Sequence, residues 1–233
     1  MSSPLAKSRK SAVDHALINA HQRLSHGRRI GILAAELAAR IEQMVKAEPG
    51  QPVRVLDVGC GDMTLADAIQ QRLGPVVMRC VDVHACPPER VAQDPRWQRY
   101  STFDGRHLDF APDSFDVVMM SDVLHHVQPD DRPLLLTSAG RVGRHVLVKD
   151  HLEHGWFSRQ MLRAMDVVGN YGYGVPIPRR YFDRDSLESL FTQAGLGMDR
   201  MDVGVNLYGH LPVLRSLLSP DWQVIAVASR RPA

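Results

Sequence analysis

Apolar residues recur with a helical period near the start of the chain. Five of them follow one another at steps of 3, 4, 4 and 3 residues, at Ile30, Leu33, Leu37, Ile41 and Met44. This spacing places them on one face of a helix, so we predict helical structure within residues 14–46, with Ser25 as an N-cap. Two prolines and a glycine in residues 48–52 are expected to end it.

Short β-rich runs alternate with helical runs from residue 53 onward. The expected strands are Val53–Val58, Val76–Val83, Phe115–Met120 and the surroundings of Val146–Val148. Such alternation predicts a parallel sheet covered by helices. The unbroken apolar run of residues 117–120 is typical of a strand buried on both faces.

The pattern changes after residue 150. Trp156–Val168 is expected to be helical, and Asp185 is expected to start a further helix with Glu188 in a capping box. Gly195 stands where a helix C-cap glycine belongs. Residues 201–205 and 222–228 are strand-like and could form an antiparallel pair.

The predicted fold class is therefore α/β, a Rossmann-like doubly wound sheet that is mostly parallel, with an antiparallel edge strand and an N-terminal helical cap. We interpret residues 1–50 as a tail and helical cap, and residues 51–233 as the main domain. A chain of 233 residues with 44% hydrophobic and 23% charged residues can bury one large core, which excludes disorder.

Charge and cysteine content narrow the partners and the compartment. The formal net charge is +2, too balanced to favour nucleic acid as the default partner. Three cysteines without a CxxC pair favour a reducing, cytoplasmic location and no zinc or redox dithiol motif. We expect no signal peptide, because Asp14 and His15 stand where one would need an apolar run. We expect no integral membrane segment, because no apolar stretch reaches roughly 18 residues.

The strongest chemical signal is the segment Val53–Met63, a buried strand that runs into Asp57-Val58-Gly59-Cys60-Gly61 and then a helix. Glycines at such a junction let a ligand approach the main chain closely. Asp82 follows the next strand, 21 residues after Gly61. An acid there can accept the hydroxyls of a ribose, although it could instead cap the helix that begins near Pro87.

The glycine turn departs from the pattern of nicotinamide-binding proteins. Their fingerprint has a third glycine at the start of the helix, where this chain has Met63 and Thr64. The departure disfavours a dehydrogenase.

Several spaced segments together resemble the class I S-adenosylmethionine (SAM)-dependent methyltransferases, over about residues 53–150. They are Asp57–Gly61, Asp82, Phe103–Gly105, Asp113–Val118 and Ser121–Val127. The chain is most similar to the small-molecule branch, which includes quinone-ring C-methyltransferases and natural-product O- and N-methyltransferases. First-motif loops of that family usually have a third glycine where this chain has Met63, so its side chain is expected to narrow the space near the methionine moiety.

The resemblance implies SAM as cofactor and S-adenosylhomocysteine as product, with no metal. It implies that Asp57 binds the ammonium of the ligand, directly or through a water molecule. It implies that Asp82 binds the ribose and that Asp104 accepts from the adenine amino group. The implied cofactor-binding residues are Asp57, Gly59, Cys60, Gly61, Asp82, Val83, Asp104, Gly105 and Ser121.

Histidines near the carboxyl ends of the strands are the candidate catalytic bases, because ligands bind there in open α/β sheets. They are His126 and His151, followed by His125. If the acceptor is an amine or an acidified carbon, no base is required. Asn170, Tyr171 and Tyr173 lie in a glycine-rich loop that could form a wall of the substrate site, although a connecting loop with surface tyrosines would have the same composition. The N-terminal helices could form a lid over the cofactor or, equally, a solvated helix pair that packs on the edge of the sheet.

We therefore predict a SAM-dependent methyltransferase of a small molecule, with oxygen as the first choice of acceptor and carbon or nitrogen as alternatives. A nicotinamide-dependent oxidoreductase and a non-catalytic SAM-binding scaffold are the rival interpretations. No Asn-Pro-Pro-Tyr motif follows the fourth strand, which disfavours a methyltransferase of flipped bases. A homodimer is compatible with the sequence.

Overall fold

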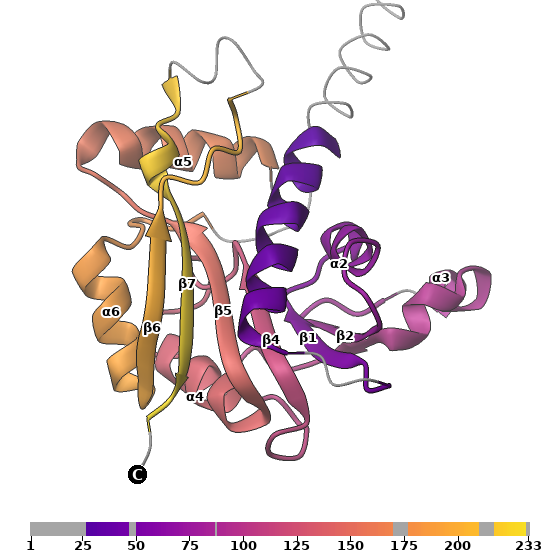
Figure 1. The fold of residues 1–233 in the computed structure, drawn as a ribbon. Helices are drawn as coiled ribbons and strands as arrows, with labels where there is room; N and C mark the ends of the chain where they lie inside the picture. The colour runs from indigo at the N-terminus through magenta and orange to yellow at the C-terminus, as the bar shows by residue number, and fades with distance from the viewer. Residues whose placement is uncertain (1–26, 47–49, 87, 170–176, 210–216, 232–233) are drawn as a thin grey trace, which may run out of the picture.

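In the computed structural model of the protein, the described residues are 27–46, 50–86, 88–169, 177–209 and 217–231. They form a seven-stranded sheet in the order β3-β2-β1-β4-β5-β7-β6 (Figure 1). The strands are β1 (Val53–Val58), β2 (Val76–Asp82), β3 (Tyr100–Thr102), β4 (Phe115–Ser121), β5 (Gly143–His151), β6 (Leu196–Val203) and β7 (Gln223–Arg230).

The strand order reverses between β1 and β4. From β1 the chain builds outward through β2 to β3, and then returns to add β4 and β5 on the other side, all in parallel. Strand β7 runs antiparallel to both β5 and β6. The predicted Rossmann-like sheet with an antiparallel strand near one edge is confirmed. In such sheets, ligands bind at the carboxyl ends of the strands beside the reversal point.

Helices cover both faces of the sheet. The first described helix spans residues 27–44, and the others are α2 (Thr64–Gln70), α3 (Pro88–Gln93), α4 (Arg132–Val142), α5 (Trp156–Gly169) and α6 (Arg184–Gln193). Two short 3-10 helices, η1 (Pro95–Arg99) and η2 (Pro220–Trp222), complete the described elements.

Two apolar layers pack on opposite faces of the sheet. The first helix and α2 share one layer with Val55, Val117 and Met119, whereas α4 and α6 share the other with Val118 and Met120. Neighbouring residues of β4 therefore point into different layers, as the pleat of a strand requires. This arrangement explains why residues 117–120 are all apolar and confirms that β4 is buried on both faces.

The sequence misplaced one helix start. Helix α6 begins at Arg184, and Asp183 caps it: the backbone amide of Ser186 donates to Asp183 Oδ1 at 2.8 Å, and the Asp183 amide donates to Ser186 Oγ at 2.9 Å. The predicted box of Asp185 with Glu188 is wrong, because Asp185 lies inside the first turn. The predicted glycine at the C-terminal end of α6 is confirmed, because Gly195 follows the helix with φ +74°.

Several predictions fall outside the described residues, among them the N-terminal tail, the helical structure expected over residues 14–26 and the Ser25 cap. The division at residue 50 stays a prediction. The helix of residues 27–44 nevertheless shares its apolar layer with the sheet. Within the part of the chain that the structure describes, no helix combines the length and apolar character needed to cross a bilayer.

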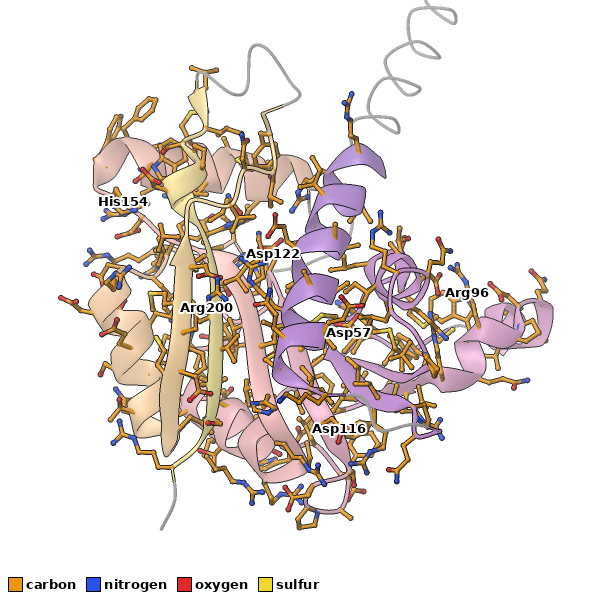
Figure 2. The ribbon with its side chains drawn as sticks, viewed as in Figure 1. Asp57, Arg96, Asp116, Asp122, His154 and Arg200 are labelled. Carbon is orange, nitrogen blue, oxygen red and sulfur yellow. The ribbon has the colours of Figure 1, made fainter. Side chains whose placement is uncertain are left out.

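Asp116 ties the starts of two central strands together, at the end of the sheet opposite Asp122 (Figure 2). Its Oδ2 accepts the backbone amide of Arg54 at 2.9 Å, and its Oδ1 accepts Nη2 of the same residue at 2.9 Å. We predict that Asp116→Ala lowers the free energy of unfolding by about 1–3 kcal/mol, because it leaves a strand amide without its acceptor.

Urea denaturation followed by circular dichroism measures this loss. The matched control is Asp109→Ala, an exposed aspartate whose removal is expected to change stability by less than about 0.5 kcal/mol. Equal stability of the two variants would contradict the structural role given to Asp116.

Candidate active site

The turn after β1 has the backbone of a ligand-binding glycine loop. The Gly59 amide still donates to the carbonyl of Val81 at 2.8 Å, after which the chain leaves the sheet with φ +75° at Gly59 and +54° at Gly61. Such torsions favour glycine. A Cβ added to Gly61 would find no heavy atom within 4 Å in the described part of the chain, so the space over this residue is open to a ligand.

Met63 stands where the third glycine is missing, and its backbone is left-handed, with φ +62°. Its side chain is fully buried in the apolar layer that contains the first helix. The expectation that Met63 narrows the ligand space is therefore not supported: the side chain belongs to the core, where burial offsets a backbone strain of about 1–2 kcal/mol.

Asp82 joins the end of β2 to the glycine turn. Its Oδ2 accepts the Gly61 amide at 2.9 Å, and its Oδ1 accepts the His84 amide at 3.1 Å. Each carboxylate oxygen has two lone pairs, so Asp82 keeps capacity for the hydroxyls of a ribose. These bonds place it at the turn, as the ribose interpretation requires.

Asp57 lies next to Asp82 in the same acidic corner. It is 2% exposed, and burial together with the charge of Asp82 raises the pKa of its carboxyl to about 7, against a smaller opposing effect of Arg99. The corner thus holds two neighbouring acids, one of which is costly to ionise. A cationic ligand group would remove that cost.

The segment after β3 contributes a turn and an apolar surface. Asp104 is half-exposed. Its hydrogen bond with the His107 ring, together with those it accepts from the backbone amides of His107 at 2.6 Å and Arg106 at 2.8 Å, holds its pKa well below the usual range. Gly105 has φ +84°, and a Cβ there would lie 3.4 Å from Val83, which is itself 55% exposed. The adenine role of Asp104 stays a prediction.

Two other predicted cofactor residues have clear positions. The thiol of Cys60 is hydrogen-bonded to Cys80, and this bond and burial raise its pKa, so Cys60 is an inert part of the turn. Ser121 is the last residue of β4 and pairs with Lys149 of β5. The predicted substrate residues Asn170, Tyr171 and Tyr173 lie outside the described residues.

A buried polar cluster occupies the ends of β4 and β5, and Figure 2 shows its member Asp122 beside the first helix. Asp122 has φ +58°; it binds Arg29 Nη2 at 3.1 Å through Oδ2 and the ammonium of Lys149 through Oδ1. Lys149 is fully buried. Although burial opposes ionisation, these cations hold the pKa of Asp122 well below its usual range.

His125 pairs with Asp150 inside this cluster. The distance from Nδ1 to Asp150 Oδ1 is 2.6 Å, and both side chains are 0% exposed. Burial lowers the pKa of His125, but the attraction of Asp150 outweighs it, so the pKa is raised. The other ring nitrogen, Nε2, lies 3.6 Å from Asp166 Oδ2 and has no hydrogen-bond partner among the residues described.

The two other candidate histidines have different surroundings. His151 is buried, with Nε2 at 3.5 Å from Asp122 Oδ1; burial and the neighbouring Lys149 lower its pKa to about 3, so its ring is neutral. His126 is partly exposed, and its ring centroid lies 3.9 Å from that of His125. The structure therefore brings all three predicted histidines to one place.

Sequence reasoning left several residues of this cluster out of the site. Lys149 and Asp150 form a polar run with His151 at the end of an apolar strand, a signal that could have found them. Asp166 of α5 carried no such signal in the sequence. Its carboxylate accepts a hydrogen bond from the Tyr181 hydroxyl and lies near His125 because α5 packs against this end of the sheet. The sequence also predicted no metal site, yet donor atoms of His125, His151 and Asp166 lie within 4.8 Å of one another.

A model of a family described as a methyltransferase domain matches residues 26–200. The chain belongs to this methyltransferase family. The match confirms the prediction of a SAM-dependent methyltransferase, and with it the cofactor, and it extends beyond residues 53–150 into the first helix.

This methyltransferase resembles one curated protein and many solved structures. It is 32% identical over 127 residues to the pyochelin synthetase PchF of Pseudomonas aeruginosa, an alignment of 48% of this chain and 7% of that protein. The chain thus spans only a small part of that relative.

Two solved structures illustrate the likeness in fold. The mitomycin 7-O-methyltransferase MmcR is 16% identical, with a TM-score of 0.58 over 99% of this chain and 61% of its own. The 1,6-didemethyltoxoflavin-N1-methyltransferase of Burkholderia thailandensis, solved with 1,6-didemethyltoxoflavin and S-adenosylhomocysteine, is 16% identical, with a TM-score of 0.58 over 100% of this chain and 92% of its own.

The raised pKa of Asp57 gives a pH-dependent prediction for this methyltransferase. Only the ionised carboxylate can pair with the ammonium of S-adenosylhomocysteine, so affinity is expected to rise by at most about tenfold per pH unit as the pH increases toward about 7, and then to level off. Isothermal titration between roughly pH 5.5 and 8.5 measures this. Asp57→Asn should weaken binding and flatten the profile; an unchanged profile would argue against contact between Asp57 and the ammonium.

Proposed function

We propose that this methyltransferase transfers a methyl group from SAM to an oxygen atom of a small molecule, with His125 as the base. The observation that carries the proposal is the His125–Asp150 pair, which lies at the carboxyl ends of β4 and β5, beside the glycine turn of β1. Strands β1 and β2 thus provide the acidic corner for the cofactor, and the neighbouring strands β4 and β5 provide the proton acceptor.

The acidic corner fits the cofactor. SAM supplies a methyl group that its positively charged sulfonium already activates. We assign Asp82 to the ribose hydroxyls and Asp57 to the ammonium, since both are acceptors beside the open space at Gly61. Exposed Val83, in contact range of Gly105, offers an apolar surface to the adenine, with Asp104 as acceptor for its amino group.

Among the three predicted histidines, the geometry favours His125 as base. A base needs an orienting partner and a nitrogen with a free lone pair. Asp150 accepts the Nδ1 proton and fixes the tautomer, so Nε2 is left to take a proton from an acceptor hydroxyl. Asp166, 3.6 Å from Nε2, would stabilise the imidazolium. His151, with its pKa lowered to about 3, is too weak a base.

The substrate class is argued from the relatives. The neighbours named above act, by their names, on mitomycin and on 1,6-didemethyltoxoflavin, both small molecules. This supports a small-molecule, natural-product type of acceptor for this chain. A nitrogen or carbon acceptor remains the alternative, because such atoms need no base.

Other sequence-based predictions are retained as part of this proposal. They are a cytoplasmic location, which rests on the cysteine content, and the absence of a nucleic-acid substrate, which rests on the balanced charge and the missing Asn-Pro-Pro-Tyr motif. A homodimer is compatible with the sequence, but no feature of the sequence indicates it directly. A non-catalytic SAM-binding scaffold is the rival function, whereas the family match argues against the oxidoreductase.

Asp82→Ala tests the cofactor corner and separates enzyme from scaffold. The variant loses the proposed ribose contacts and the hydrogen bond from the Gly61 amide. It is expected to bind S-adenosylhomocysteine about 10–100-fold more weakly. Isothermal titration measures this change, and Asp109→Ala, at an exposed residue, is the control. The same variant should abolish the one-methyl mass gain that the wild type produces in a screen of hydroxylated metabolites. Unchanged binding would refute the assignment of Asp82.

His125→Ala tests the base. It should lower kcat by roughly 10²–10⁴-fold without changing the affinity for S-adenosylhomocysteine, whereas His154→Ala, an exposed histidine, should retain activity. Because the pKa of His125 is raised, kcat of the wild type should increase with pH through a midpoint above about 6.5. Asp150→Asn should move that midpoint to lower pH. Full activity of His125→Ala would refute His125 as the base and would leave His126 or an acceptor that needs no base, such as nitrogen or carbon.

A further inference from the structure

We propose that His125, His151 and Asp166 form a binding site for one divalent transition-metal ion, with Zn²⁺ as the best-suited ion. The three residues come from the segment after β4, from the end of β5 and from α5. One donor atom from each lies within 4.8 Å of the others, and all three side chains are buried. No motif links them in the sequence, and Asp166 lies 41 positions after His125.

The distances are close to those of a zinc site. Bonds of about 2.0–2.2 Å in a tetrahedral site hold neighbouring donors about 3.3 Å apart. Nε2 of His125 and Oδ2 of Asp166 are already 3.6 Å apart. Bringing His151 to the same spacing requires a side-chain shift of an ångström or two, the order of the difference between 4.8 Å and the ideal spacing.

Unpaired nitrogens inside the cluster point to a missing ligand. His125 Nε2 and His151 Nδ1 are both buried and without hydrogen-bond partners in the described ranges. An unsatisfied buried polar atom costs about 1–3 kcal/mol. A cation coordinated by the two rings would remove part of this cost.

The surroundings resemble the outer shell of a metal site. Histidine ligands of metals usually donate their second N–H to a carboxylate, which fixes the ring and raises its basicity. His125 makes this contact with Asp150 at 2.6 Å, and Nε2 of His151 lies 3.5 Å from Asp122. The Tyr181 hydroxyl orients the third ligand, Asp166.

The charges of the cluster permit a cation. Arg29 and Lys149 bring two positive charges, and both are bound to Asp122. Asp150 and Asp166 remain as acids, so the five groups carry a formal charge of −1 (two positive, three negative). Two imidazoles and one carboxylate suit Zn²⁺, whereas Mg²⁺ prefers an all-oxygen set.

The test uses the full chain, freed of metal by a chelator and dialysed. Isothermal titration with Zn²⁺ should give one strong site per chain, and Co²⁺, a spectroscopic substitute, should give the intense visible absorption of a low-coordinate site. His151→Ala and Asp166→Asn are each expected to weaken Zn²⁺ binding at least about tenfold, and exposed His154→Ala should leave it unchanged.

Circular dichroism shows whether each variant is folded, and the wild-type Co²⁺ spectrum provides a readout that needs no variant. The proposal fails if Co²⁺ shows only the weak spectrum of a hydrated ion, or if folded His151→Ala and Asp166→Asn bind Zn²⁺ as the wild type does.

A consequence for activity rests on the proposed function. The ion would occupy Nε2 of His125, the nitrogen assigned to the base, so Zn²⁺ should inhibit methylation and a chelator should restore it. Metal binding without inhibition would leave the site intact and contradict the base role of His125. Inhibition without a strong site in the titration would overturn the metal site.

Discussion

The buried ion pair between Lys149 and Asp122 organises the polar cluster at the ends of β4 and β5. An ammonium group removed from water costs several kcal/mol unless it is paired, and Lys149 is fully buried. Asp122 meets this requirement, and its second oxygen binds Arg29 of the first helix. One carboxylate therefore holds β4, β5 and the N-terminal helix together, and the positions of His125 and His151 depend on that junction.

The two halves of the site differ in electrostatic character. At β1 and β2, Asp57 and Asp82 form an acidic corner in which one carboxyl is costly to ionise, an environment that favours a ligand with cationic groups. At β4 and β5, acids and bases are mixed and paired. Such pairing avoids leaving an isolated charge in the interior. The reversal of strand order places the halves side by side.

Among the described residues, several buried polar atoms without a hydrogen-bond partner gather in this cluster: His125 Nε2, His151 Nδ1 and Asp150 Oδ2. Native proteins satisfy most of their buried polar groups, so these atoms support the proposals of a substrate hydroxyl or a metal ion at this place. A strained backbone at Asp122, with φ +58°, occurs in the same place. Such strain persists where surrounding contacts fix it, commonly at functional sites.

The sequence by itself determined the parallel sheet, the glycine turn and the acid at position 82, because alternating strand and helix runs, unbroken apolar strands and glycine turns leave local signals in residue type. It also placed three histidines at strand ends. The capping residue of α6 was missed by two positions, since several neighbouring polar residues can cap and only the backbone selects among them. Only the tertiary structure decided that Met63 enters the core, that Asp150 orients His125, and that Asp166 approaches from α5. These contacts join segments far apart in the chain, and no spacing rule connects residues that meet only when a helix packs against the end of a sheet.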